Sequence, residues 1–177
     1  MTAPLGNPAF DLARPDRRRV VVGIGDLAVS NSPRDVLVTH ALGSCVAVCV
    51  FDPIAHVAAL LHFMLPESRI NVERGRERPA TFADTGIPLL FQSAYRYGLE
   101  KTRAVVKLVG GAEIAGIGQE SFRTGRRNAL AAKQVLWRNG VLVNAEDTGS
   151  NVARTVHFGV RDGRVRIYSG CGAIREI

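Results

Sequence analysis

The chain has 177 residues, which is enough for one domain with a substantial core and too short to favour two. Its 46% hydrophobic and 22% charged residues are ordinary for a globular protein. No apolar run reaches the roughly 18–20 residues that a membrane-spanning helix needs, which argues against membrane insertion. The formal net charge of +7 favours acidic partners, either nucleic acid or an acidic protein surface.

The start of the chain and the cysteines set the expected compartment. Residues 1–19 combine three prolines with a run of arginines and lack the apolar core of a signal peptide. We therefore expect a flexible tail at 1–19, a single domain at 20–177 and a cytoplasmic protein. The odd cysteine count (Cys45, Cys49 and Cys171) argues against a disulfide framework. No clustered Cys/His spacing suggests a metal, and no cofactor is expected.

The first half of the chain reads mainly as strands. Residues 20–24 and 27–29 predict one opening strand interrupted by Gly25, and residues 36–39 predict a second. Two continuous apolar runs, 45–51 and 56–65, flank an Asp-Pro turn and predict a buried hairpin. The alternative is a pair of short buried helices, because a continuous apolar run has no period. The valines of the first run favour strands.

The second half alternates helices and strands. The polar, Arg-rich residues 67–81 predict an exposed loop, and residues 83–97 predict a helix that ends before Gly98. A strand at 104–109, a helix at 126–138 and a strand at 141–145 follow. A closing hairpin at 155–160 and 164–168 is predicted around Asp162-Gly163. The pattern indicates an α/β protein with a mixed sheet.

The stretch from Thr39 to Pro66 is the best candidate for chemistry. Cys45 follows a tight turn, Gly43-Ser44, whose backbone N–H groups can stabilise a thiolate and later an oxyanion. The predicted hairpin returns His62 towards Cys45, and a Cys/His pair is the minimum for nucleophilic catalysis. Thr39 can orient the histidine through its hydroxyl.

Each of these residues also has a purely structural interpretation. A cysteine or a lone histidine in an apolar strand is usually a core residue. Cys49 lies about 13 Å from Cys45 along the same strand, too far to share its site. His40 is an alternative base, although an extended chain turns it to the face opposite Thr39. No interleaved aromatic residues or known motif support nucleic-acid binding.

A family resemblance separates these interpretations. The segments T-x-x-L-G-S-C-V-A-V, from Thr39, and H-F-M-L-P, from His62, resemble the signature of the CheD family of chemoreceptor glutamine deamidases. The similarity continues through K-L-V-G-G-A, from Lys107, and D-T-G, from Asp147. Ser150 follows that last motif where the family commonly has a second glycine, which bears on specificity more than on chemistry.

The resemblance implies both a fold and an activity. The implied fold is a layered α/β/β/α sandwich, like the catalytic domain of the cytotoxic necrotizing factor deamidases. The implied activity is hydrolysis of protein glutamine side chains by Cys45, His62 and Thr39. The implied substrates are the cytoplasmic helices of methyl-accepting chemoreceptors. A second hypothesis is a binding module that regulates a CheC-type chemotaxis phosphatase.

Three further residues are candidates for the oxyanion or substrate site. Gly43 and Ser44 form the turn before the cysteine, and Asn128 matches an asparagine motif of the family. The Asn128 side chain could position substrate, or it could equally tie down a loop.

Overall fold

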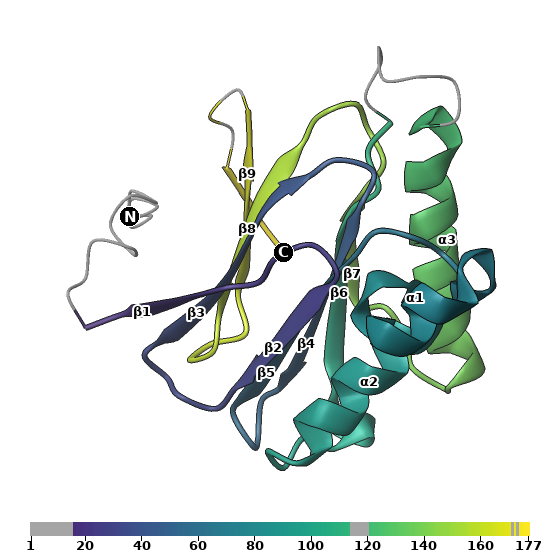
Figure 1. The fold of residues 1–177 in the computed structure, drawn as a ribbon. Coiled ribbons are helices and arrows are strands. Elements are labelled where there is room, and N and C mark those ends of the chain that lie inside the picture. The colour runs from purple at the N-terminus through teal and green to yellow at the C-terminus, as the bar shows by residue number, and fades with distance from the viewer. Residues whose placement is uncertain (1–15, 114–120, 171, 173) are drawn as a thin grey trace.

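The structure is a computed structural model that describes residues 16–113, 121–170, 172 and 174–177 (Figure 1). Its strands are β1 (Arg18–Val21), β2 (Asp26–Ser30), β3 (Asp35–Leu42), β4 (Val46–Asp52), β5 (Val57–Phe63), β6 (Val105–Gly110), β7 (Ala145–Thr148), β8 (Arg154–Gly159), β9 (Val165–Ser169) and β10 (Ile174–Glu176). Its α-helices are α1 (Val72–Glu77), α2 (Ala83–Tyr95) and α3 (Ser121–Arg138). None of the helices in the described ranges is long and apolar enough to cross a membrane.

The strands form two stacked five-stranded sheets. The first has the order β1-β3-β8-β9-β10 and the second β2-β5-β4-β6-β7. The β1–β3 and β6–β7 pairs are parallel and the others are antiparallel, so both sheets are mixed and the predicted mixed-sheet α/β class is confirmed. The helices lie against the second sheet (Figure 1). Among the described residues the layers are therefore sheet, sheet and helices, with no helix over the outer face of the first sheet.

The second sheet is buried on both faces, which explains the continuous apolar runs. Along β4, Val46, Val48 and Val50 pack towards the helices, whereas Ala47 and Cys49 pack between the two sheets. Strands that are covered on both faces need no polar alternation. The predicted hairpin is confirmed, because β4 pairs with β5 in an antiparallel register through the Asp-Pro turn.

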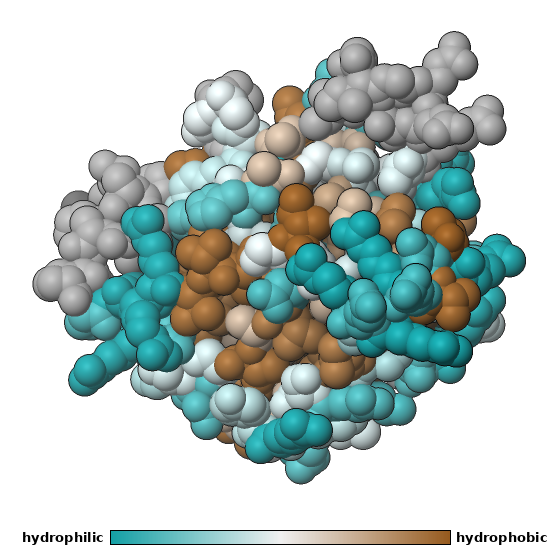
Figure 2. Space-filling view, in the orientation of Figure 1, coloured by the Kyte–Doolittle hydropathy of each residue, from teal (hydrophilic) through white to brown (hydrophobic). Residues whose placement is uncertain are grey.

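The chain changes sheets at Gly25, where the sequence had predicted a single interrupted strand. β1 belongs to the first sheet and β2 to the second. Gly25 adopts a φ of 70°, which favours glycine, and its N–H donates to the His62 carbonyl over 2.7 Å. β1 also begins at Arg18, so the last residues of the expected tail belong to a strand, while 1–15 lie outside the described residues. Strands β1 and β2 are edge strands of their sheets, and Val21, the last residue of β1, and Ile24, in the connection to β2, are exposed. Figure 2 shows apolar side chains gathered on this face of the molecule.

The prediction of an exposed loop at 67–81 is wrong. This segment forms two short 3-10 helices, Ser68–Ile70 and Pro79–Thr81, on either side of α1. The Asn71 side chain caps α1 by accepting from the Arg74 N–H over 2.9 Å. The Asp84 carboxylate accepts from the Ser68 N–H and hydroxyl and ties the segment to α2. Hydropathy reports neither the cap nor these hydrogen bonds to Asp84.

The remaining elements follow their predictions with shifts at the ends, except for one strand. The two longer helices and the closing hairpin are confirmed, and Gly163 at its turn has a φ of 67°. The predicted strand at 141–145 is wrong, because β7 starts only at Ala145. Val141 instead caps α3 by donating to the Leu136 carbonyl, and Asn144 donates to the Val106 carbonyl as the chain enters the sheet. Cys171 lies outside the described residues.

Asp52 anchors the β4–β5 turn. Its fully buried carboxylate accepts from the backbone N–H groups of Ile54, Ala55 and Glu100 and from two nitrogens of Arg103. Burial pushes the pKa of Asp52 upward, but the hydrogen bonds from Arg103 and these N–H groups outweigh it and hold the pKa below its usual range. The turn that sets the hairpin register therefore depends on this carboxylate.

We expect Asp52→Ala to lower the free energy of unfolding by about 3 kcal/mol, because it leaves several N–H groups without an acceptor and removes the buried partner of Arg103, which then keeps Glu100 as its ion-pair partner. Chemical denaturation at pH 7 measures the change. Glu67→Ala, which removes the exposed partner of Arg69, is the matched control and should cost less than about 1 kcal/mol. Equal losses in the two variants would contradict this role for Asp52.

Candidate active site

The Thr39 and His62 side chains meet between the two sheets. Thr39, on β3, is fully buried, and His62, on β5, is 1% exposed. The Thr39 hydroxyl lies 2.7 Å from His62 Nδ1 and donates to the Val22 carbonyl over 2.7 Å. A hydroxyl has one proton, and Thr39 donates it to the Val22 carbonyl. The Thr39 oxygen must therefore accept a hydrogen bond from a protonated Nδ1 of His62. This arrangement leaves Nε2 as the unprotonated nitrogen of the ring.

His62 Nε2 is buried and has no hydrogen-bond partner among the described residues. An unpaired buried polar atom is costly and rare in native proteins. An unpaired ring nitrogen of this kind is available to accept a proton.

The register places Cys45 on the same face of the second sheet as His62. Ala47 pairs directly with His62, and Val46 pairs with Phe63. Cys45 immediately precedes β4 and packs against the same core cluster as Ala47, as the alternation of side chains along the strand would predict. Cys45 is thus a diagonal neighbour of His62, at a Cα separation of about 7–8 Å that is typical of such pairs. The structure therefore brings the three predicted residues Thr39, Cys45 and His62 to one end of the interface between the sheets.

Close backbone packing holds the turn that carries Cys45. The Cys45 carbonyl accepts from the Gly111 N–H over 2.8 Å, and the Gly43 carbonyl accepts from the Ala112 N–H over 2.8 Å. A Cβ on Gly110 would lie 2.3 Å from the Cys45 carbonyl oxygen, and Gly110 also has a φ of 116°. The Gly-Gly pair is therefore needed for this close approach.

Asn128 braces the same turn from α3. Its side chain is fully buried, and Nδ2 donates to the Ser44 carbonyl over 2.9 Å and to the Met64 carbonyl over 2.8 Å. These carbonyls belong to the residue before Cys45 and to the segment just after His62. Both amide protons are used in this way, which supports the interpretation that Asn128 ties down a loop. Asn128 thus fixes the separation between the turn that carries Cys45 and the segment that follows His62.

Burial shifts the pKa values of the Cys45 and His62 side chains. Burial raises the pKa of the Cys45 thiol, partly opposed by a hydrogen bond from the Cys45 backbone N–H. Burial lowers the pKa of His62 to about 4. At neutral pH the site therefore holds a thiol and a neutral imidazole rather than a thiolate–imidazolium pair.

We expect the alkylation of Cys45 by iodoacetamide to keep accelerating as the pH rises past about 8.5, the pKa of an ordinary thiol. Initial rates between pH 5 and pH 10, followed by peptide mapping, measure this and separate Cys45 from the other cysteines. A rate plateau that begins below pH 7 would contradict the expectation, because it would reveal a preformed thiolate.

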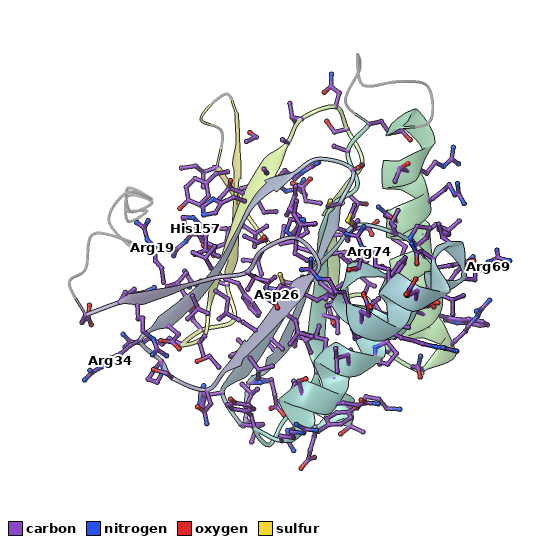
Figure 3. All side chains as sticks on the ribbon, viewed as in Figure 1. Arg19, Asp26, Arg34, Arg69, Arg74 and His157 are labelled. Atoms are coloured by element: carbon purple, nitrogen blue, oxygen red, sulfur yellow. The ribbon has the colours of Figure 1, made fainter. Side chains whose placement is uncertain are left out.

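The other histidines and Cys49 lie away from this site. His40 is exposed on the opposite face of β3 from Thr39. His157 pairs with Val38 and packs at a tilted angle against Tyr168, on the side of the first sheet that carries Arg19 (Figure 3). Cys49 is fully buried, and burial raises its pKa to about 12.

Two contributors to the site were not predicted from the sequence. The Val22 carbonyl, which accepts from Thr39, lies in a segment that had been assigned to a single strand. A bulge distorts β3 just after Thr39, where the β3–β8 register shifts and Ala41 has a φ of 55°. A backbone acceptor gives no signal in a sequence, and neither Ala41 nor its neighbours predict a bulge.

Comparisons with known proteins place the chain in a family. A family model described as CheD chemotactic sensory transduction matches residues 64–169. A probable chemoreceptor glutamine deamidase CheD 1 of Syntrophus aciditrophicus is 47% identical over 89% of this chain and 98% of its own length. A probable chemoreceptor glutamine deamidase CheD 2 of Anaeromyxobacter dehalogenans is 48% identical over 85% of this chain and 94% of its own.

One further relative and one solved structure are also similar to the chain. A probable chemoreceptor glutamine deamidase CheD of Pyrococcus abyssi is 38% identical over 85% of this chain and 91% of its own length. Protein NMB0706 of Neisseria meningitidis overlaps 76% of this chain and 63% of its own at 10% identity and a TM-score of 0.40, which is too low to support an argument. With the family model and near full-length relatives in agreement, the chain belongs to the CheD family.

Proposed function

We propose that this chain is a chemoreceptor glutamine deamidase, which converts glutamine side chains of chemoreceptors to glutamate and releases ammonia. Its relatives are named for this activity. The observation that carries the proposal is the Thr39–His62 pair, which leaves a bare, buried Nε2 on the face that Cys45 shares. This is the arrangement that a base needs to take a proton from a thiol.

In the first half of the reaction Cys45 is acylated. The thiol proton passes to His62 Nε2 as the sulfur attacks the amide carbon of the glutamine, because both groups are neutral before the attack. The tetrahedral intermediate collapses when His62 returns that proton to the amide nitrogen. The C–N bond breaks, ammonia leaves and a thioester with Cys45 remains.

In the second half water replaces the ammonia. His62, again neutral, takes a proton from a water molecule that attacks the thioester carbonyl. The C–S bond breaks, the sulfur takes the proton back from His62, and the product is a glutamate side chain. Cys45 and His62 are then restored to their starting states.

Backbone N–H groups would stabilise the oxyanion in both halves. The Cys45 N–H already lies against its own sulfur, and we assign the second donor to the N–H of Ser44. The Gly43 N–H donates to the Ala41 carbonyl and shapes the turn instead. Asn128 holds this turn through the Ser44 carbonyl. Each oxyanion donor typically contributes about 3–4 kcal/mol of transition-state stabilisation.

The neutral Thr39 orients His62 without stabilising its charge. An aspartate at this place, as in serine hydrolases, would favour the imidazolium, whereas a hydroxyl only selects the tautomer. The buried imidazole is therefore a weak base, which suits a slow modifying enzyme better than a fast metabolic one.

We expect Thr39→Val to lower kcat by about tenfold to a hundredfold with little change in KM, because His62 loses its tautomer selection. Thr39→Ser keeps the hydroxyl and should retain activity within about fivefold. Steady-state deamidation of receptor fragments, monitored by ammonia release, measures both variants. If Thr39→Val keeps wild-type kcat, Thr39 does not orient the base.

The direct test of the function is mass spectrometry of chemoreceptor cytoplasmic fragments incubated with catalytic amounts of the protein. The proposal predicts amide-to-acid conversion at a few discrete glutamines and none without the protein. Fragments in which those glutamines are replaced by glutamate are the matched control and should release no ammonia. Absence of conversion on several receptors would overturn the proposal.

The partners would follow from this activity. The enzyme would act on the cytoplasmic helices of chemoreceptors and hence work in the cytoplasm. Regulation of a CheC-type phosphatase is the second hypothesis, and a pull-down with such a phosphatase tests it. A stable complex without deamidation would favour the regulator over the enzyme.

A further inference from the structure

A trough lies between α3 and β7, beside the turn that carries Cys45. It has a volume of about 360 Å³. Its lining includes Gly111, Arg126, Leu130, Lys133, Thr148 and Ser150. One wall is thus a helix face and the other is the connection between β7 and β8, at the same end of the molecule as the β3–β4 connection (Figure 1). We call this feature the α3–β7 trough.

The α3–β7 trough adjoins the backbone of the turn that carries Cys45. Gly111 lines it, and the Gly111 N–H donates to the Cys45 carbonyl over 2.8 Å. The far wall is held in place, because the Gly149 N–H donates to the Gly110 carbonyl and the Gly149 carbonyl accepts from the buried Arg154. A molecule bound in the trough would therefore lie against a fixed surface beside the turn that carries Cys45.

Exposed apolar side chains continue the trough along α3. Leu130 is 54% exposed and Trp137 is 74% exposed. Arg126, Leu130, Lys133 and Trp137 follow the spacing of one helix face and span about 17 Å, or three turns. An exposed tryptophan in line with an exposed leucine is typical of protein-binding surfaces, in which tryptophan often contributes most of the binding energy.

The positive charge of α3 favours an acidic partner. The helix sequence contains five basic residues, Arg123, Arg126, Arg127, Lys133 and Arg138, and no acidic one. Two acidic residues lie close by: Glu113 lines the trough, and Glu146 pairs with Lys133. Arg126 and Arg127 are exposed. A partner with acidic side chains beside an apolar stripe would match this surface.

We propose that the α3–β7 trough and the exposed face of α3 bind an acidic amphipathic helix, the one that carries the target glutamine. This inference rests on the proposed function and names the docking surface for its substrate. Apolar residues of the bound helix would cover Leu130 and Trp137, and its carboxylates would face Arg126 and Arg127. A helix-in-groove contact three turns long would provide the specificity that a single glutamine side chain cannot.

Trp137 is the single tryptophan of the chain, so its fluorescence reports on this surface directly. A tryptophan-free chemoreceptor cytoplasmic fragment is titrated into the Cys45→Ala protein, which holds substrate without turnover. We expect the Trp137 emission to shift to shorter wavelength and acrylamide quenching to fall, with saturation. Added salt should weaken the binding. A fragment whose surface glutamates are replaced by lysines is the matched control and should leave the emission unchanged.

Kinetics of the active protein provide the second test. Trp137→Ala and Leu130→Ser are expected to raise KM for the fragment about tenfold or more, with kcat within about twofold of wild type. Ile54→Ala removes an apolar side chain that is 70% exposed at the β4–β5 turn, and it should change neither constant.

The outcomes separate the docking surface from the proposed function. In one outcome the fragment is deamidated while the Trp137 emission stays unchanged at saturating fragment, with saturation checked by the anisotropy of a labelled fragment. That result overturns the docking surface and leaves the proposed function standing. A shift in emission without deamidation by the active protein overturns the function and leaves the docking surface standing. An equal response to the lysine-substituted fragment overturns the acidic character of the partner.

Discussion

Cys45→Ala is expected to lower the rate of glutamine deamidation by at least about 10⁴-fold, because removing the nucleophile removes the covalent route altogether. The thiol lies at the entry to β4 on the face of His62, and no other described cysteine shares this position. Ammonia release and mass spectrometry of the receptor fragment both measure the rate. Circular dichroism establishes that the variant is folded.

The matched control for this prediction is Cys49→Ala. Cys49 lies on the same strand and the same face, about 13 Å further along, and is fully buried. Its loss should cost about 1 kcal/mol of stability and change the deamidation rate by less than about threefold. If both variants lose activity equally, the loss reflects damage to the core, and Cys45 is not the nucleophile.

His62→Gln is expected to lower kcat by about a thousandfold, because no group remains to take the thiol proton or to protonate the leaving nitrogen. Glutamine keeps a polar side chain of similar length in the buried site, which limits the loss of stability. Single-turnover kinetics separate the chemical step from substrate binding. Retention of more than a tenth of the wild-type kcat would show that another residue acts as the base.

The same substitution has a signature in the pH dependence of stability. Burial lowers the pKa of His62 to about 4, against about 6.5 in the unfolded chain, so the unfolded state binds more protons between these values. The wild type should therefore lose stability as the pH falls from about 6.5 to 4, by at most about 3 kcal/mol from this residue. Burial, with smaller effects of the Arg19 and His40 charges, also lowers the pKa of His157 to about 4. His157 therefore contributes to the pH dependence of stability in both the wild type and His62→Gln. His62→Gln should thus flatten the profile without abolishing the slope.

The contacts that could be predicted from the sequence are those within one hairpin. Cys45 and His62 flank an Asp-Pro turn, and antiparallel pairing through that turn brings them to neighbouring positions. The spacing of α2 and α3 and the Asp-Gly turn of the last hairpin are likewise local, and all three elements are confirmed.

The contacts that could not be predicted join distant elements. Thr39 in the first sheet contacts His62 in the second. The Val22 carbonyl, which accepts the Thr39 hydroxyl proton, lies in the segment where the chain passes from one sheet to the other. Asn128 reaches carbonyls 84 and 64 residues away. Hydropathy patterns report which face of an element is buried and say nothing about which element lies against it.

Residues in unusual backbone conformations form a second group that the sequence did not indicate. Ala41, beside Thr39, and Ser150, beside the α3–β7 trough, have φ angles of 55° and 66°. A glycine adopts such angles without strain, whereas Ala41 and Ser150 carry a Cβ atom. Ala41 lies at the bulge two residues after Thr39, whereas His56, with a φ of 51°, lies in the β4–β5 turn away from the site.

The central claim, a thioester between the substrate and Cys45, is tested most directly by partitioning with hydroxylamine. A thioester accepts hydroxylamine in place of water, and the target glutamines then become hydroxamates as well as glutamates. We predict that the hydroxamate fraction rises with hydroxylamine concentration in the wild-type reaction, at the same glutamines, and is absent with Cys45→Ala. Glutamate as the single product at every hydroxylamine concentration, at an undiminished rate, would contradict the covalent mechanism and indicate direct attack by water.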